Sequence, residues 1–308
     1  MTSIVKTWGF LIYLTLAIAA VLFIAHKKST EPKLHRKTYS LADRKRLPKC
    51  PLLPPGLIGR TPVTEGMTEA DVERNLTDVR LGGRWWPTHC SAIWSVAIIV
   101  PYRDRELMMG PFLNNIHPIL QRQLVNYTIY IVEQIPGKRF NKAKVFNVGF
   151  ALALKYGPHD CYAFQDIDCL SEDDRNFYYC ADQPRHLGSS VSRFNYTVFA
   201  QHIGCSCLMT EWQVRKVNGW SNRYYGWGAE DDDMYRRVRA EGMELWRFPK
   251  HSAAYTTLEH PQAAENPDRF ELLKRSVRNY KKDGLSSLEY TLVNIEKKPL
   301  YTKYHVDV

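Results

Sequence analysis

The segment YYGWGAEDDDMYRRV (residues 224–238) contains four consecutive carboxylates. Neighbouring carboxylates repel one another, and a solvated acidic loop is the simplest explanation for such a run. The flanking residues favour a site instead, because Gly226 and Gly228 lie on either side of Trp227 and let the backbone bend around its ring. Apolar residues at helical spacing follow the acids and predict a helix, whose N-terminus stabilises negative charge. The segment therefore predicts a carboxylate site at the start of a helix.

A second acidic pair stands in FQDIDCL, where Asp166 and Asp168 come directly after the apolar run 161–164. Carboxylate oxygens suit a divalent cation, and a substrate that carries a diphosphate would share that cation. Two loop acids that cap the next helix are the alternative for this pattern. If 161–164 is a strand of a parallel sheet, both acids lie at its carboxyl end, where such sheets bind ligands. This placement favours a metal site.

Two arginines, Arg103 and Arg105, stand beside Tyr102 in VPYRDR. Guanidinium groups bind phosphate through forked hydrogen bonds, and an aromatic ring can stack on a base. The alternative is a surface loop in which Asp104 is the ion-pair partner. His260, in TTLEHPQ, is a lone histidine in a polar stretch, and such residues are usually solvated. On these residues alone, a phosphate site and a plain surface loop are equally well supported.

The elements that must position these residues alternate between strand and helix. Apolar runs predict buried strands, and apolar residues three and four apart predict helices. The predicted order is strand Val96–Val100, helix Leu107–Leu124, strand Tyr127–Val132, helix Lys142–Tyr156 and strand Cys161–Phe164. Pro101 is expected to end the first strand, and Pro118 to kink or break the first helix. This order implies right-handed crossovers and an α/β fold with a mostly parallel central sheet.

The first residues of the 308-residue chain predict a membrane anchor. Trp8–Ala25 is an uncharged apolar run of 18 residues, long enough to span a bilayer. A cleaved signal peptide is the alternative, since Ala17 and Ala19 form an A-x-A pattern. The run stays apolar beyond that pattern, which favours an uncleaved helix. We therefore expect a cytoplasmic tail at 1–7, a transmembrane anchor at 8–25, a basic stem at 26–49 and a folded domain at 50–308.

The net charge of +10 is concentrated in the predicted stem. Residues 26–50 hold nine lysines and arginines against two acidic residues, while residues 51–308 carry only +2. The folded domain therefore lacks the basic excess that nucleic-acid binding needs, which excludes that class of partner. Lysines that directly follow the anchor argue against a lumenal domain under the positive-inside rule.

Sequons and cysteines favour a lumenal domain instead. Asn75, Asn126 and Asn195 each begin an N-glycosylation sequon beyond the anchor. The seven cysteines show no C-x-x-C spacing typical of a zinc site. In an oxidising compartment some of them should pair, and the odd number leaves at least one free thiol.

Three longer segments, FNVGFALALKYG, FQDIDCLSEDDRNFYYCADQPRH and NGWSNRYYGWGAEDDD, resemble in this order the beta-1,4-galactosyltransferase family. The similarity extends from about Cys50 to Phe270. The resemblance implies a Rossmann-like nucleotide-sugar transferase fold of the A type, in the lumen, within a single-pass type II Golgi membrane protein. It also implies an inverting, metal-dependent transfer of galactose from UDP-galactose, in β-1,4 linkage, to a terminal N-acetylglucosamine of a glycoprotein or glycolipid.

The resemblance assigns roles to individual residues. The positions that match the binding segments for the nucleotide sugar are Pro101, Tyr102, Arg103, Arg105, Phe140, Lys142, Asp166, Ile167, His202 and Trp227. Lys142 replaces the arginine that is usual in the family. The positions that match the acceptor pocket are Phe199, Arg269 and Phe270. The implied disulfides are Cys50–Cys90 and Cys161–Cys180, which leave Cys169, Cys205 and Cys207 unpaired.

The acidic cluster and the metal site also receive roles from the resemblance. Asp231 matches the proposed base, Glu230 a donor-sugar contact and Asp232 an acceptor-hydroxyl contact. Asp168 and His260 match two metal ligands. An inverting transfer needs one carboxylate to accept the proton of the attacking hydroxyl, while its neighbours hold donor and acceptor in line.

Two positions depart from the family pattern. Thr257 stands where the family commonly has a methionine as the third protein ligand of the metal. The resemblance implies Mn²⁺ as cofactor. A hydroxyl is a harder and weaker ligand than a thioether, so Mg²⁺ is the alternative. His202 stands where a tyrosine restricts the donor to galactose. Histidine is smaller than tyrosine, so UDP-N-acetylgalactosamine is the alternative donor.

Other classes of protein compete with this interpretation. A sugar-binding relative with weak catalysis would follow if the Thr257 substitution had disabled the metal site. A glycoside hydrolase also uses paired carboxylates, but it needs no metal-binding D-x-D and no phosphate-binding arginines. A nuclease needs a basic face on the folded domain, and the net charge of only +2 on residues 51–308 argues against one. The sequence alone leaves the natural acceptor open.

Overall fold

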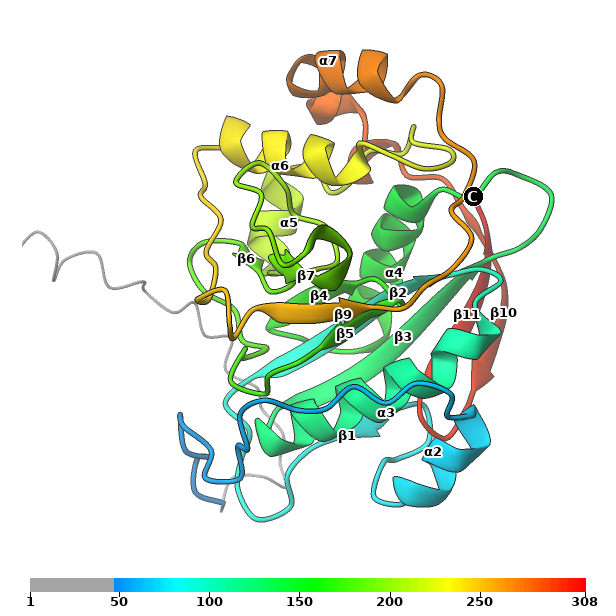
Figure 1. Ribbon diagram of the computed structural model, residues 1–308. Helices are drawn as coiled ribbons and strands as arrows, with labels where there is room; N and C mark the ends of the chain where they lie inside the picture. The colour runs from blue at the N-terminus through cyan, green and yellow to red at the C-terminus, as the bar shows by residue number, and fades with distance from the viewer. Residues whose placement is uncertain (1–46) are drawn as a thin grey trace, which may run out of the picture. The chain divides into compact units, whose positions relative to one another are not determined.

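The computed structural model describes residues 47–308 (Figure 1). The predicted tail and membrane anchor, and nearly all of the predicted stem, lie outside these described residues. Within residues 47–308, no helix is both long enough and apolar enough to cross a bilayer.

Helices and strands alternate through the first half of the described chain, as expected. The α-helices are α2 (Glu69–Asn75), α3 (Glu106–Arg122), α4 (Lys142–Tyr156), α5 (Glu211–Lys216), α6 (Glu230–Ala240) and α7 (Arg269–Asn279). The strands are β1 (Arg84–Trp85), β2 (Ser95–Tyr102), β3 (Asn126–Gln134), β4 (Cys161–Gln165), β5 (Cys169–Ser171), β6 (Arg185–His186), β7 (Ser190–Val191), β8 (Ser206–Met209), β9 (Ala254–Thr257), β10 (Thr291–Lys297) and β11 (Thr302–Asp307). The five elements predicted between residues 96 and 164 are all present, with ends that differ by a few residues.

The main sheet has the order β10-β11-β3-β2-β4-β8-β6, and β1 also pairs with β3. The pairings of β11 with β3, β3 with β2, and β2 with β4 are parallel. The pairings of β10 with β11, β4 with β8, β8 with β6, and β1 with β3 are antiparallel. The prediction of a mostly parallel sheet is therefore wrong: the centre is parallel and both edges are antiparallel. The edge strands come from segments in which no strand was predicted.

Pro101 and Pro118 were expected to end a strand and to kink or break a helix, but both elements continue past them. Pro101 lies inside β2, opposite Val132 of β3. On its other side β2 pairs with β4 only from Val96 to Ile99, so no ladder bond is lost at the proline. Pro118 lies inside α3, which continues to Arg122. The apolar side chains of α3 are deeply buried, and this burial offsets the roughly 3 kcal/mol that an interior proline costs a helix.

Helices α3 and α4 cover opposite faces of the main sheet. Alternate residues of a strand point to opposite faces, and β2 shows this directly. Val96, Ile98 and Val100 pack with α3, whereas Ala97 and Ile99 pack with α4. Both faces of β2 are therefore buried, which explains its continuous apolar sequence.

A second, three-stranded sheet has the order β5-β9-β7 and lies in front of the main sheet in Figure 1. The turn from β4 into β5 contains Asp166 and Asp168, so the acidic pair lies where the chain passes from one sheet to the other. Disulfides join Cys50 to Cys90 and Cys161 to Cys180, the two pairs that the resemblance implied.

Candidate active site

A cavity of about 530 Å³ opens beyond the carboxyl ends of β2 and β4, where ligands bind in open α/β sheets. Most of the predicted site residues line it. They are Pro101, Arg103, Arg105, Phe140, Lys142, Asp166, Ile167, Asp168, His202, Trp227, Glu230, Asp231 and His260. These residues come from segments that are far apart in the sequence, and the fold brings them to one place.

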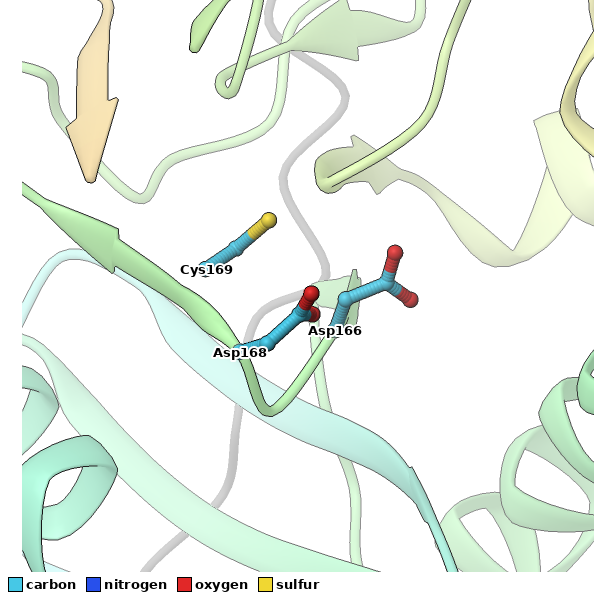
Figure 2. Close-up of side chains that lie close together, drawn as sticks. All are labelled: Asp166, Asp168 and Cys169. Atoms are coloured by element: carbon cyan, nitrogen blue, oxygen red, sulfur yellow. The ribbon is translucent and has the colours of Figure 1, made fainter. Parts of the chain in front are cut away.

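One wall of the cavity carries the candidate metal ligands. His260 Nε2 lies 3.2 Å from Asp168 Oδ2, so the histidine that looked solvated in the sequence contacts the D-x-D turn. Potential ligand atoms of Asp166, Asp168 and Cys169 all lie within 4.8 Å of one another, and Figure 2 shows the three side chains on this turn. Carboxylate, imidazole and thiol groups in such proximity fit a divalent cation.

Thr257, which replaces the family's methionine ligand with a hydroxyl, also lines the cavity on this wall. Its hydroxyl lies 3.1 Å from Ser192 Oγ, which also accepts the backbone N–H of Thr257 at 2.9 Å. The threonine hydroxyl is therefore engaged by its neighbour.

Lys142 is the central cation of the site. Its Nζ lies 2.9 Å from Glu230, 3.1 Å from Asp231 and 3.3 Å from Asp166. Lys142 begins α4, whereas Glu230 and Asp231 begin α6 and Asp166 follows β4. One ammonium group therefore holds carboxylates of two separate elements together and offsets their mutual repulsion.

The charges around Lys142 separate the pKa values of the carboxyl groups. Burial acts to raise the pKa of Asp231, but Lys142 and His202 outweigh it, and the pKa lies below its ordinary value. Burial raises the pKa of Asp166 to about 7, because Lys142 offsets only part of the desolvation there. Burial lowers the pKa of His202, but Asp232 and Asp231 overcome this and leave it raised. Asp231 is thus ionised at neutral pH and able to accept a proton.

The backbone before the acidic cluster is held in unusual conformations. Gly226 and Gly228 have φ of 90° and 114°, which suit only glycine, and Ala229 has φ of 70°. The predicted helix α6 then begins at Glu230, so Glu230, Asp231 and Asp232 lie in its first turn.

The fourth carboxylate of the run has a different role. Asp233 is buried, pairs with Arg237 one turn later and accepts a hydrogen bond from Tyr224. The charge-assisted pair lies within α6 and stabilises the helix, and the Tyr224 hydrogen bond ties α6 to the segment before it. Only the first three acids therefore belong to the site, and Asp233 stabilises the helix that presents them.

The arginines of the VPYRDR segment lie at the mouth of the cavity. Arg103 donates to the carbonyl of Lys138, and Arg105 lies 3.2 Å from His260 Nδ1. Both guanidinium groups line the cavity and can reach a phosphate there. Tyr102 differs from the expectation, because only 2% of it is exposed and it does not line the cavity. It faces the α3 side of β2, since its neighbours alternate along the strand.

The residues that match the acceptor pocket lie outside the cavity lining. Phe199 and Phe270 are exposed, and the guanidinium of Arg269 lies 4.6 Å from the ring centre of Phe270. Phe199 packs edge-on against Phe194, which does line the cavity. Exposed aromatic rings around a polar cavity are suited to stack on sugar rings. Asp232 contacts His202 at 3.4 Å.

Among the other cavity residues, four with basic or thiol side chains were not predicted as site residues: Arg139, Arg193, Cys169 and Cys205. Arg193 forms an ion pair with Asp168 at 3.2 Å, so it reaches the candidate metal ligands. The sequence did not indicate a role for Arg193, because this residue stands two positions before a sequon in a segment with no helical or strand pattern. The two cysteines were visible only as unpaired thiols.

The three sequons differ in their exposure. Asn75 and Asn195 are exposed, at the end of α2 and next to a short helical turn. Asn126 begins β3, is half-buried, and its side-chain amide donates to Ser95 Oγ at 3.3 Å. Glycosylation at all three positions stays a prediction, and Asn126 is the least accessible.

Comparisons with protein families place the chain in a group of glycosyltransferases. Residues 50–181 match the family described as the N-terminal region of glycosyl transferase group 7. Residues 185–261 match the family described as the N-terminal domain of galactosyltransferase. The two matches together cover the cavity residues from Pro101 to His260.

Individual relatives decide the family. Beta-1,4-galactosyltransferase 2 of Cricetulus griseus is 37% identical over 269 residues, which cover 85% of this chain and 73% of the relative. The chain belongs to the beta-1,4-galactosyltransferase family. Beta-1,4-galactosyltransferase 4 of the same species is 38% identical over 271 residues, which cover 86% of this chain and 78% of the relative. The resemblance read from the motifs and the expected enzyme class, a glycosyltransferase, are both confirmed.

A solved structure shows the same fold. The catalytic domain of Drosophila beta1,4galactosyltransferase 7, in complex with xylobiose, matches with a TM-score of 0.61 and 24% identity. The match covers 70% of this chain and 94% of that chain. A mutant of the Drosophila enzyme was solved with manganese, UDP-Gal and xylobiose. The chain therefore has the expected nucleotide-sugar transferase fold, with a mixed rather than mostly parallel sheet.

Proposed function

We propose that this protein transfers galactose from UDP-galactose to the 4-hydroxyl of a terminal N-acetylglucosamine, with inversion at the anomeric carbon. The observation that carries the proposal is the position of Asp231, which is ionised, held by Lys142 at 3.1 Å and exposed to the cavity that also contains the metal ligands. The family to which the chain belongs supports the reaction class.

The protein groups divide the work of the reaction. Asp231 accepts the proton of the acceptor hydroxyl as its oxygen bonds to the anomeric carbon, and UDP departs with the electrons of the broken carbon–oxygen bond. Glu230 and Asp232 bind sugar hydroxyls on either side and hold the reacting atoms in line. Arg103 and Arg105 bind phosphate oxygens. Lys142 holds Glu230 and Asp231 together until the substrate hydroxyls replace some of their contacts.

A divalent cation fits beside Asp168 and His260. It would neutralise the charge that develops on the departing diphosphate. Mn²⁺ is the proposed ion, supported by the manganese in the Drosophila mutant complex. The carboxylates of Asp166 and Asp168 suit this ion, and the His260 imidazole can complete the donor set.

A single assay tests the reaction and the choice of donor. The full chain is incubated with Mn²⁺, a glycan that ends in N-acetylglucosamine, and either UDP-galactose or UDP-N-acetylgalactosamine. We expect transfer of galactose. His202 lines the cavity, and replacing it with the larger tyrosine should lower use of the acetylated donor relative to UDP-galactose by about tenfold or more. Absence of transfer from both donors, with UDP still bound, would instead support a sugar-binding relative or a different acceptor.

We further propose that the folded domain lies in the Golgi lumen, anchored through residues 8–25. The two disulfides and the exposed sequons at Asn75 and Asn195 support an oxidising, glycosylating compartment. In microsomes the domain should resist added protease until detergent is present, and an endoglycosidase should lower its mass. Digestion of the domain in intact microsomes would rule out this orientation.

A further inference from the structure

Cys169 brings a thiol to the candidate metal site. The residue directly follows Asp168 in the chain, only 4% of it is exposed, and it lines the cavity. Its sulfur lies within 4.8 Å of ligand atoms of Asp166 and Asp168, and Cys169 begins β5 directly after the turn that carries both aspartates (Figure 2). A cation bound at Asp168 is therefore within reach of a sulfur ligand.

The residue opposite Cys169 on the neighbouring strand is Thr257, the position that matches the family's third metal ligand. In the antiparallel pairing of β5 with β9, Cys169 lies directly opposite Thr257. Residues in such register share one face of the sheet. The Thr257 hydroxyl is engaged with Ser192, as described above, so this face offers the cation a thiol rather than a free hydroxyl.

A second thiol lies close to the first. Cys205 also lines the cavity, so it is a second possible source of a sulfur ligand there. The backbone N–H of Asp166 donates to the carbonyl of Cys205 at 2.8 Å, which fixes Cys205 beside the acidic turn. A test of a sulfur ligand must therefore distinguish Cys169 from Cys205.

We propose that Cys169 is a ligand of the cation held by Asp168 and His260. The proposal rests on the proposed function for the role of that cation, but it makes its own claim about the ligand set. On binding, the thiol releases its proton to solvent and the thiolate sulfur donates an electron pair to the cation. A sulfur ligand favours cadmium, zinc, cobalt and manganese over magnesium. This preference is opposite to the one expected from Thr257 alone.

Cobalt and cadmium substitution tests the proposal directly. Addition of one equivalent of Co²⁺ to the purified full chain in a mild detergent should produce a near-ultraviolet thiolate-to-cobalt charge-transfer band. The variant Cys169→Ser should lose the band and bind Cd²⁺ at least about tenfold more weakly. Cys207→Ser is the matched control, because Cys207 is a free, buried cysteine that packs on the α4 side of the sheet. It should keep the band.

Two further measurements distinguish the proposal from its alternatives. Loss of the band in Cys205→Ser, with the band retained in Cys169→Ser, would assign the sulfur ligand to Cys205 and overturn the proposal. If Cys169→Ser does not fold, X-ray absorption of the zinc-loaded wild-type chain still reports whether a sulfur atom lies about 2.3 Å from the metal. Absence of that sulfur would contradict the proposal.

The proposal and the proposed function can fail separately. Galactose transfer without any sulfur signature would leave the enzyme activity standing and remove Cys169 from the ligand set. A sulfur signature without transfer from a UDP-sugar would keep the ligand set and remove the proposed reaction.

Discussion

Lys142 decides the electrostatics of the site at the scale of single residues. Three carboxylates, two at the start of α6 and one just after β4, contact one half-buried ammonium group. Without it, Asp231 would lie beside two other carboxylates with no neighbouring ammonium group and would hold its proton more tightly. The lysine therefore maintains Asp231 as an ionised base.

Removal of this charge should change the pH dependence of the reaction. Lys142 lowers the pKa of Asp231, so this carboxylate stays ionised well into the acidic range. We therefore expect kcat/KM to fall only at low pH. In Lys142→Met the pKa of Asp231 rises, and the acidic limb of the kcat/KM profile should move to higher pH. Lys142→Arg preserves the charge and is the matched control. An unmoved limb in Lys142→Met would show that Lys142 does not set the pKa of Asp231.

Sequence reasoning was most successful for single residues with distinctive neighbours. Asp168, Glu230 and Asp231 stand in motifs with glycines, aromatics or a second acid, and all three line the cavity. Arg193 and Cys169 reach the same place through folding alone, and no local pattern distinguishes them. Tyr102 has the right type and spacing, but strand alternation turns it toward the core.

The alternation of strand and helix made the central elements predictable at the scale of elements. The runs that became β2, β3 and β4 are apolar because helices cover both faces of the sheet. Strands β10 and β11 were missed, because β10 is largely exposed and its sequence lacks a buried run. Strand β11 nevertheless pairs in parallel with β3 and completes the sheet (Figure 1).

The close contact between α4 and β2 depends on Gly149. A Cβ at this position would lie 2.2 Å from Ile99 Cγ2, inside a fully buried core. We expect Gly149→Ala to lower the free energy of unfolding by about 1–3 kcal/mol, as overpacked cores do. Chemical denaturation measures the change. Gly56→Ala is the control, because nothing lies within 4 Å of that position and its loop is exposed. Equal stability of the two variants would contradict this packing.

Three buried histidines link the stability of the whole molecule to pH. Burial lowers the pKa of His117 to about 4, and lowers those of His159 and His186 to about 3. Each is neutral in the fold and has hydrogen-bond partners there. His117 faces Tyr127 and the Leu300 carbonyl, His159 faces Tyr130 and Ser95, and His186 faces Arg247 and the Gly204 carbonyl.

The sign of the effect follows from proton binding. Between pH 6.5 and 4 the unfolded chain protonates these histidines and the folded chain does not, so stability falls as pH falls. Asp166 acts in the opposite direction, because its pKa of about 7 in the fold lets the folded chain bind a proton there. On unfolding, the three histidines take up protons and Asp166 releases one, so about two protons are taken up in total. The free energy of unfolding should therefore fall by up to about 3 kcal/mol for each unit by which the pH is lowered.

Chemical denaturation at pH 6.5 and pH 5 tests this dependence. The variant His159→Gln should show a shallower fall in stability, because one of the three sites is removed. His89→Gln, at an exposed position, should behave as the wild-type chain does. A stability that rises toward acidic pH would contradict the account of the buried histidines.

The central claim is that Asp231 is the base of a galactosyl transfer, and Asp231→Asn tests it most directly. The amide is nearly the same size but accepts no proton at neutral pH. With saturating UDP-galactose, Mn²⁺ and an acceptor that ends in N-acetylglucosamine, kcat should fall by about 10²–10⁴-fold while UDP still binds. A variant that keeps the wild-type kcat would contradict the assignment of Asp231 as the base.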